Sequence, residues 1–231
     1  MKRIVALLLF VAFISMPAVN AQKKERLFTG HIDFELKYEG LDPAQETQMP
    51  KTISMVFKDH KSKTVLDLGM YAMNTITDGD NEFILIYLDI MGQKYAYKQL
   101  KSEIDEKTKD ADKPDVKLID ETKQIAGYAC KKAEITSVDE ETLESITTTI
   151  WYTQELNISP KATFSSNIEG IDGFAMETET ILGEGIKQVM TASNVKIVKP
   201  NKVKITEFLM PADAKEMTLD EFIEMFGGGE E

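Results

Sequence analysis

The ten residues Gly30–Glu39, GHIDFELKYE, decide the fold class of this chain. Apolar and polar residues alternate strictly through this stretch, so that one face carries Ile32, Phe34, Leu36 and Tyr38. The other face carries mostly charged side chains. A period of two is the pattern of a β-strand that buries one face and exposes the other to water. The stretch therefore predicts a half-buried strand.

The same alternation continues outward through most of the chain, which predicts a mainly β protein. A second strand is expected around Ile53, Met55 and Phe57, and further strands near Thr64–Leu68, Tyr71–Thr77, Phe83–Ile90, Gln93–Leu100, Val116–Asp120, Tyr128–Thr136, Ser145–Tyr152, Gly173–Leu182, Ile186–Lys199 and Lys202–Phe208. Short turns between them favour antiparallel hairpins over βαβ units. We expect a single curved antiparallel sheet or half-open barrel, in one domain that spans residues 22–231.

Two segments depart from simple alternation. The nearly continuous apolar run FILIYLDI, Phe83–Ile90, predicts a strand that is covered on both faces. The charged stretch 101–113 predicts a solvated excursion or a short helix between two halves of the sheet. A domain boundary at this stretch would leave each half small for a core of its own.

The end of the chain predicts a short helix packed on the sheet. Thr218 is placed as its N-cap, and Glu221 three residues later is placed as the capping-box partner. Gly227 is placed as the residue that ends it. One apolar face follows the i, i+3, i+4, i+7 spacing, through Leu219, Phe222, Ile223 and Phe226. So short a helix is marginal in water, so this face must dock, and it would form a lid on the open side of the sheet.

The first residues resemble a cleavable secretory signal, residues 1–21. Lys2 and Arg3 precede the apolar run 4–14, which is too short to span a bilayer. Small residues before Ala21 predict cleavage after it, in preference to an uncleaved anchor. Because no cysteine lies near this point to accept a lipid, we expect a soluble periplasmic or secreted protein that is not a lipoprotein.

The charge composition of the chain argues against two classes of binding partner. The chain has 27 basic and 39 acidic residues and a formal net charge of −12. Nucleic-acid binding needs clustered Lys and Arg, and docking on anionic lipid head groups needs positive charge, so the acidity opposes both. No apolar stretch after the signal reaches the roughly 18 residues of a transmembrane helix.

No motif of a known catalytic or metal site stands in the sequence. The chain lacks HExxH, CxxC, GxSxG and a glycine-rich phosphate loop. The DGDN segment 78–81 has a faint likeness to a calcium loop, but it lacks the later ligands and favours a hairpin turn. Two histidines and one cysteine make a transition-metal site hard to assemble. We expect no catalytic residue, metal or cofactor, and no enzyme.

The sulfur-containing residues leave alternatives open. Cys130 is the only cysteine, so no internal disulfide forms, and a small buried hydrophobe is favoured over a reactive thiol or an intermolecular bridge. His31 and His60 lie far upstream as partners for a nucleophile. Methionines in the expected strands favour gap-filling in a core over a lipid-adapted cavity. Met70-x-x-Met73 also fits soft copper ions.

Two segments resemble a known group of proteins. The segment KQIAGYACKKA, Lys123–Ala133, is similar to exported proteins of Gram-negative bacteria that are grouped as a domain of unknown function. Phe208–Pro211 and KEMTLDEF, Lys215–Phe222, resemble that group's closing signature. Exported proteins of the GLPGLI type share a similar G-Y-x-C element.

This resemblance implies a fold similar to the periplasmic lipoprotein carriers of the LolA/LolB-like type. In these, a curved antiparallel sheet forms a half-open barrel around an apolar cavity, and helices form a lid. The resemblance carries over no catalytic or ligand residue. The sequence departs from the pattern because it predicts only one firm helix that could act as a lid.

Two functional hypotheses follow. The first is a periplasmic module that binds a lipid, an acyl chain or another apolar ligand on the concave side of the sheet, with a lining of Phe34, Leu36, Met55, Phe57, Met176 and Met190. The C-terminal helix would be its lid. The alternative is a non-enzymatic interaction or scaffold protein of the cell envelope, with a filled core and a sheet edge that adds a strand from a partner protein.

Overall fold

The computed structural model describes residues 26–138, 145–182 and 185–226. The expected signal, residues 1–21, and the expected helix stop at Gly227 lie outside these ranges. Among the described residues, no helix is long and apolar enough to cross a membrane.

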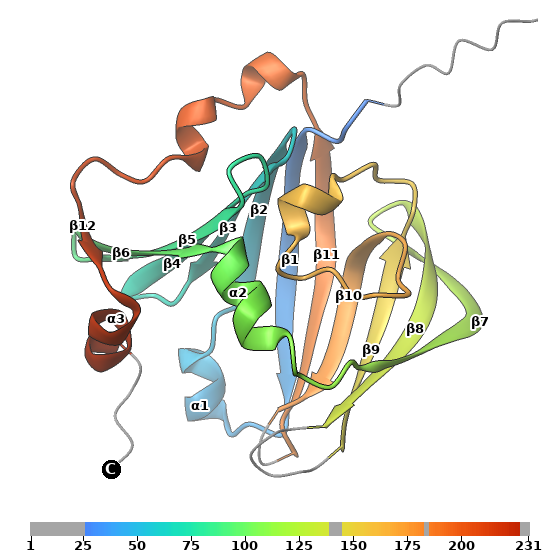
Figure 1. Cartoon of the computed structure of the whole chain (residues 1–231). Helices are drawn as coiled ribbons and strands as arrows, with labels where there is room; N and C mark the ends of the chain where they lie inside the picture. Colours follow the sequence, from blue (N-terminus) through green and yellow to red (C-terminus); the bar gives the residue numbers. More distant parts are fainter. Residues whose placement is uncertain (1–25, 139–144, 183–184, 227–231) are drawn as a thin grey trace, which may run out of the picture.

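The prediction of a mainly β fold with one curved sheet is confirmed (Figure 1). The described ranges form a twelve-stranded sheet in the order β12-β6-β5-β4-β3-β2-β1-β11-β10-β9-β8-β7. Its first half is a meander of β1 (Gly30–Glu39), β2 (Thr52–Lys58), β3 (Lys61–Asp67), β4 (Tyr71–Asp78), β5 (Phe83–Ile90) and β6 (Gln93–Leu100). Its second half is a meander of β7 (Asp115–Ile125), β8 (Tyr128–Val138), β9 (Ser145–Thr153), β10 (Phe174–Ile181) and β11 (Lys187–Ile197).

Two long-range pairings complete the sheet. β1 and β11 pair antiparallel along their length, from Gly30 opposite Ile197 to Glu39 opposite Lys187, and they join the two meanders. The short strand β12 (Ala214–Met217) pairs parallel with β6, the one departure from the expected antiparallel pattern among the described strands.

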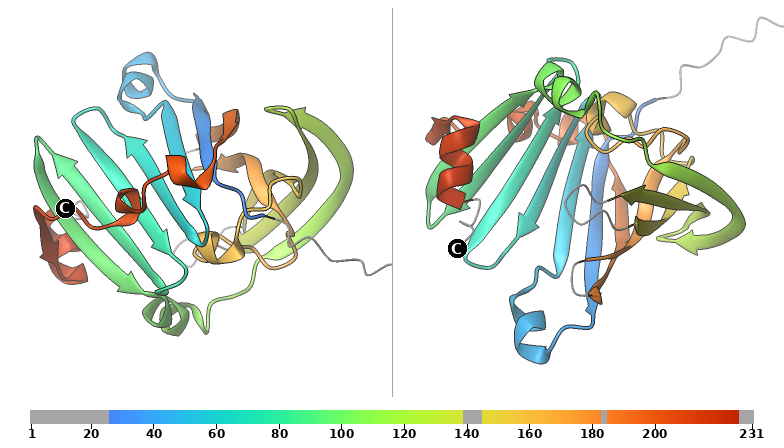
Figure 2. Two further views of the ribbon diagram at one scale, coloured as in Figure 1. Left: turned by 90° about the horizontal axis from the view of Figure 1, so that it is seen from above. Right: turned by 60° about the horizontal axis from the view of Figure 1, so that its bottom comes forward.

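The sheet bends into an open bowl, which Figure 2 shows from above. Register shifts occur in the pairings of β1 with β11, of β10 with β9 and of β7 with β8. Such bulges bend a strand and increase its twist. They explain how one continuous sheet curves without breaking into two.

Each face of the bowl has its own core. Residues directly opposite one another share a face, so Phe34, Ile53 and Ala192 lie together on the face that we call the inner face. Its core includes Phe57, Met176 and residues of the β9–β10 connection. The opposite, outer face packs under the segment after β11, in a core of Ile76, Leu85, Tyr87, Ala96, Val203 and Phe208.

The outer core corrects one prediction and confirms another. Residues 202–208 do not form the expected strand; Lys202 ends the 3-10 turn η3 (Pro200–Lys202), and a second turn, η4 (Ile205–Phe208), follows after Val203 and Lys204. Pro200 starts the first turn, and Val203 and Phe208 become fully buried. Because this segment packs on β3 to β6, β5 is buried on both faces, as its apolar run predicts.

Within the described ranges, α-helices occupy two connections and the stretch after β12 (Figure 1). α1 (Pro43–Gln48) is capped by the side chain of Asp42, and α2 (Lys101–Thr108) is the short helix expected in the charged stretch. α3 (Leu219–Phe226) confirms the C-terminal helix. The Thr218 hydroxyl accepts the N–H of Glu221 at 3.2 Å, and the Glu221 carboxylate accepts the N–H of Thr218 at 2.9 Å, as the capping box predicts.

Cys130 is fully buried in a hydrophobic core cluster, which confirms the interpretation of a small buried hydrophobe. Burial raises the pKa of its thiol, because the thiolate is disfavoured away from water. A thiol with a raised pKa is a poor nucleophile near neutral pH.

Candidate functional site

The inner face holds a cavity of about 540 Å³ between the sheet and the β9–β10 connection. Its floor consists of side chains from six strands of the sheet: Phe34, Ile53, Met55, Thr64, Ile150, Thr178 and Met190. Its wall comes from the connection itself, through Thr163, Ser165, Ser166, Asn167, Ile168 and Ile171. Gly173, Phe174 and Ala175 complete the lining. None of the described residues that line this cavity carries a charge.

The wall is held in place by the turns at one end of the sheet. The 3-10 turn η1 (Pro160–Thr163) lies within the β9–β10 connection, and its carbonyl at Ala162 accepts a hydrogen bond of 2.6 Å from Ser62 on β3. Gly79, between β4 and β5, lies against η1 so closely that a Cβ atom would stand 2.3 Å from the Lys161 carbonyl oxygen. Only glycine therefore fits at this contact.

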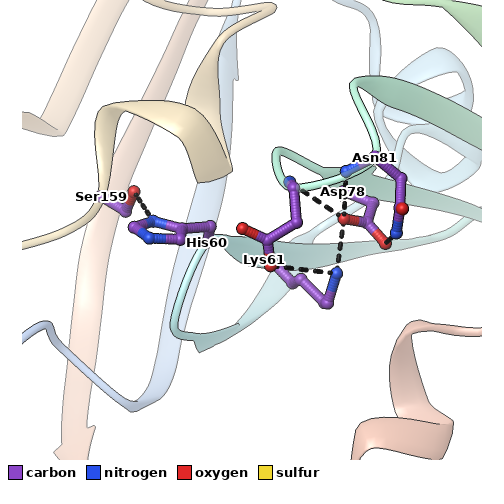
Figure 3. Close-up of polar contacts among 6 residues, drawn as sticks. His60, Lys61, Asp78, Asn81 and Ser159 are labelled. Atoms are coloured by element: carbon purple, nitrogen blue, oxygen red, sulfur yellow. Dashed lines mark hydrogen bonds and ion pairs between the residues drawn. The ribbon is translucent and has the colours of Figure 1, made fainter.

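A histidine reinforces the same attachment (Figure 3). The Nδ1 of His60 lies 2.6 Å from the Oγ of Ser159, the residue that caps η1. This spacing suits a nucleophile and its base. Ser159 is, however, buried at 2% exposure, and its Oγ also accepts the N–H of Lys161. Within the described ranges no carboxylate hydrogen-bonds the imidazole, so the geometry fits a tether between two loops.

The neighbouring DGDN segment forms the expected hairpin turn around a buried carboxylate. Asp78 forms an ion pair with Lys61 and accepts hydrogen bonds from Asn81, at 2.8 Å from the side chain and 3.1 Å from the backbone (Figure 3). Burial by itself would raise the pKa of Asp78, but the bonds from Lys61 and Asn81 outweigh it and hold the pKa below its usual range. Asp78 thereby stabilises the turn on which the cavity wall rests.

Three of the six residues predicted to line a site lie at the cavity. Phe34, Met55 and Met190 line it, from β1, β2 and β11. The other three do not: Leu36 is buried outside the lining, and Phe57 and Met176 are fully packed in the core. The ring of Phe57 has edge contacts with Phe28 and Phe174, at centroid distances of 5.8 and 5.5 Å.

The residues predicted for a lid lie elsewhere. Phe222 and Phe226 of α3 pack on Tyr97 and Tyr95 of β6, with ring centroids 6.1 and 5.4 Å apart. Leu219 is half-buried, and Ile223 is 54% exposed. α3 thus docks at the β6 end of the sheet (Figure 1), and the β9–β10 connection covers the cavity instead. The many Ser, Thr and Asn residues of that connection gave no sequence signal for such a role.

A second polar group lies on the outer face and escaped the sequence analysis. Glu177 of β10, 15% exposed at its side chain, bonds Lys123 of β7 at 2.5 Å and accepts the Thr191 hydroxyl at 3.0 Å. The Lys123 ammonium also lies 4.3 Å from the centre of the Trp151 ring. Glu177 lies directly opposite Trp151 on β9 and Thr191 on β11, and this pairing brings the side chains of the group together. Each oxygen of the Glu177 carboxylate thus has one partner within the described part of the chain.

The chain matches a protein-family model and is similar to solved structures. Residues 90–199, slightly under half of the chain, match the family model described as "N-glycanase peptide, N-terminal domain". The fold is similar to the solved structure of PNGF-II, with a TM-score of 0.54 and 18% sequence identity. That similarity covers 87% of this chain and 33% of the PNGF-II chain, so this chain spans about a third of that structure's length. A search of the curated proteins finds no match.

These matches correct the functional predictions. The expectation of a lipid or acyl-chain carrier is wrong, and so is the alternative of a non-enzymatic envelope scaffold, because the matched family is an N-glycanase domain. The expectation that the chain is no enzyme is contradicted by the same matches. The similarity to the LolA/LolB-like carriers is contradicted by these matches. The resemblance to the exported and GLPGLI-type groups is untested and stays a prediction. What the comparisons establish is a sheet fold shared with part of PNGF-II and, over 90–199, a sequence similar to an N-glycanase N-terminal domain.

Proposed function

We propose that this chain takes part in the enzymatic processing of N-glycosylated proteins, and that its inner face holds the glycosylated polypeptide. The observation that carries the proposal is the match of residues 90–199 to an N-glycanase N-terminal domain. The matched range runs from the end of β5 through β11 and includes the whole β9–β10 connection. It therefore contains most of the residues that line the inner cavity.

The cavity supports this proposal by its size and chemistry. About 540 Å³ lies within the range of roughly 300–1,000 Å³ typical of ligand sites. An uncharged lining with hydroxyl groups on an apolar floor suits a neutral ligand with both polar and apolar parts. A segment of glycosylated polypeptide has this character.

The test compares a peptide that carries one N-linked glycan with the same peptide without the glycan. We expect the chain to bind the glycosylated form about tenfold more tightly, a difference of about 1.4 kcal/mol. Isothermal titration measures the two affinities, and mass spectrometry of the same mixtures records whether glycan is released. Equal affinity for the two peptides would contradict the proposal.

We infer in addition that the protein is exported to the periplasm or the medium. The support is the basic start, the apolar run 4–14 and the small residues before Ala21. We expect mature protein isolated from the producing cell to begin at Gln22, as intact-mass measurement and N-terminal sequencing would show. A mature chain that retains residues 1–21 would refute cleavage at this point.

A further inference from the structure

We propose that the inner cavity receives an apolar, uncharged side chain of an extended peptide segment next to the glycosylated residue. This inference rests on the proposed function and specifies which part of the substrate the cavity contacts. It assigns the cavity to the polypeptide and places the glycan outside it.

The floor of the cavity favours an apolar group. Phe34, Ile150 and Met190 present apolar atoms from three different strands. Transfer of an apolar side chain from water onto such a surface is favourable by about 1.5–3 kcal/mol when burial is complete. Met55 and Met190 add adaptability, because an unbranched thioether adjusts to side chains of different shape.

The absence of charge from the lining decides against charged groups. A carboxylate, phosphate or ammonium that entered the cavity would lose its water and find no charged partner among the described lining residues. A lysine, an acidic residue or an acidic sugar would thus be disfavoured. The occupant is neutral.

The hydroxyl groups at the cavity fit a peptide backbone. Thr64 on β3, Thr178 on β10 and Ser165 on the wall form no side-chain hydrogen bond with another described residue. Each hydroxyl both donates and accepts, so it can pair with the N–H or the C=O of a bound chain. The neighbouring Asn167 is different, because its amide bonds Thr163 and the Pro160 carbonyl, both at 2.7 Å.

This balance argues for a peptide and against a sugar ring in the cavity. A sugar carries several hydroxyls that each lose water on burial, and three available hydroxyls on a mainly apolar floor would leave some of them unpaired. An extended peptide presents alternating backbone polar groups and one side chain per two residues on a given face. A bound peptide can place one apolar side chain on the floor while its backbone pairs with the hydroxyls of Thr64, Thr178 and Ser165. It then contacts both the apolar and the polar surface of the cavity.

The wall is preformed for this ligand. The bonds of His60 to Ser159 and of Ser62 to Ala162 fix the start of the connection on the turns of the first meander. The side chain of Gln154, the first residue after β9, bonds Asp172 at 2.9 Å and ties the two ends of the connection together. A wall held in this way needs little ordering when a peptide binds, which favours affinity.

The experiment uses four capped, uncharged peptides. Two carry Leu beside the asparagine and two carry Ser, and one of each pair bears a single N-acetylglucosamine on the asparagine. Titration calorimetry with the full chain should show that the Leu peptides bind about tenfold more tightly than the Ser peptides, with or without the sugar. Equal affinity for Leu and Ser peptides would overturn the inference.

Variants locate the effect. Thr178→Phe fills the cavity from its floor and should abolish the preference for Leu, whereas Thr180→Phe, two residues along the same face of β10 and outside the lining, should keep it. If the melting curve shows that Thr178→Phe does not fold, Ser165→Trp on the exposed wall provides the same test. A Leu preference that survives in both folded variants contradicts the inference.

The effect of the sugar on affinity distinguishes this inference from the proposed function. If the sugar strengthens binding in every variant while the Leu preference is absent, the inference fails and the proposed function stands. If the Leu preference is present but the sugar changes nothing, the proposed function fails and the cavity remains a peptide site. A sugar preference that Thr178→Phe alone removes would assign the cavity to the glycan and overturn the inference.

Discussion

Replacement of Phe57 by Ala should lower the free energy of unfolding by about 3–5 kcal/mol, because the mutation leaves a void that the core cannot close. Phe57 is 1% exposed, and its ring is held between Phe28 and Phe174. β2 cannot shift inward to fill the space, since it is hydrogen-bonded to β1 on one side and to β3 on the other. Urea denaturation followed by circular dichroism measures the loss.

The matched control is Met91→Ala, which removes a large side chain that is 96% exposed. This change should alter the free energy of unfolding by no more than about 0.5 kcal/mol. A loss below about 1 kcal/mol for Phe57→Ala would mean that the inner core repacks freely, contrary to the paired strands around it.

Replacement of Asp78 by Ala should cost about 3 kcal/mol, because the partner ammonium of Lys61 stays buried without its ion pair. The two side chains are 6% and 14% exposed, respectively. This loss of stability is at the low end of the range for breaking a buried ion pair, because the carboxylate of Asp80 lies 3.5 Å from the same ammonium. The control is Asp80→Ala: its side chain is 48% exposed, and its removal should cost less than about 1 kcal/mol.

The same carboxylate predicts a dependence of stability on pH. Because the folded state lowers the pKa of Asp78 below its usual 3.8, the ionised form contributes its full stability above that value. This contribution disappears as the pH falls below 3.8 through the folded-state pKa. The free energy of unfolding, measured by urea denaturation at a series of pH values from about 5 downward, should therefore decrease more steeply for the natural chain than for Asp78→Ala. Parallel curves for the two proteins would show that Asp78 is not perturbed by folding.

Local signals explain the parts of the fold that the sequence predicts well. Strict alternation in Gly30–Glu39 predicts β1, and the capping pair Thr218 and Glu221 predicts the start of α3, because each feature depends on residues a few positions apart. The parallel pairing of β12 with β6 depends on residues more than 100 positions apart, and no local pattern announces it. The segment 202–208 resembles a strand in its alternation, yet burial of Val203 and Phe208 against the outer face fixes it as turns.

The candidate site shows the same division. Alternation correctly places Phe34, Met55 and Phe57 on one face of the sheet. It cannot distinguish a residue that lines a cavity from one packed in a core, because that depends on what covers the face. The cover is the polar β9–β10 connection, whose buried Leu156 and Ala162 seal the core over Phe57 while the hydroxyl-rich remainder leaves a space over Phe34 and Met55.

The pairing of β1 with β11 also sets the order in which the protein can form during synthesis. The two strands are separated by about 150 residues, and a contact this distant carries a large loop-closure cost before it contributes stability. A ribosome that adds roughly 5–20 residues per second needs on the order of ten seconds to make the intervening chain. During this time β1 has only β2 as a neighbour, and its other edge offers unpaired N–H and C=O groups. We expect the two meanders to form first and the bowl to close last.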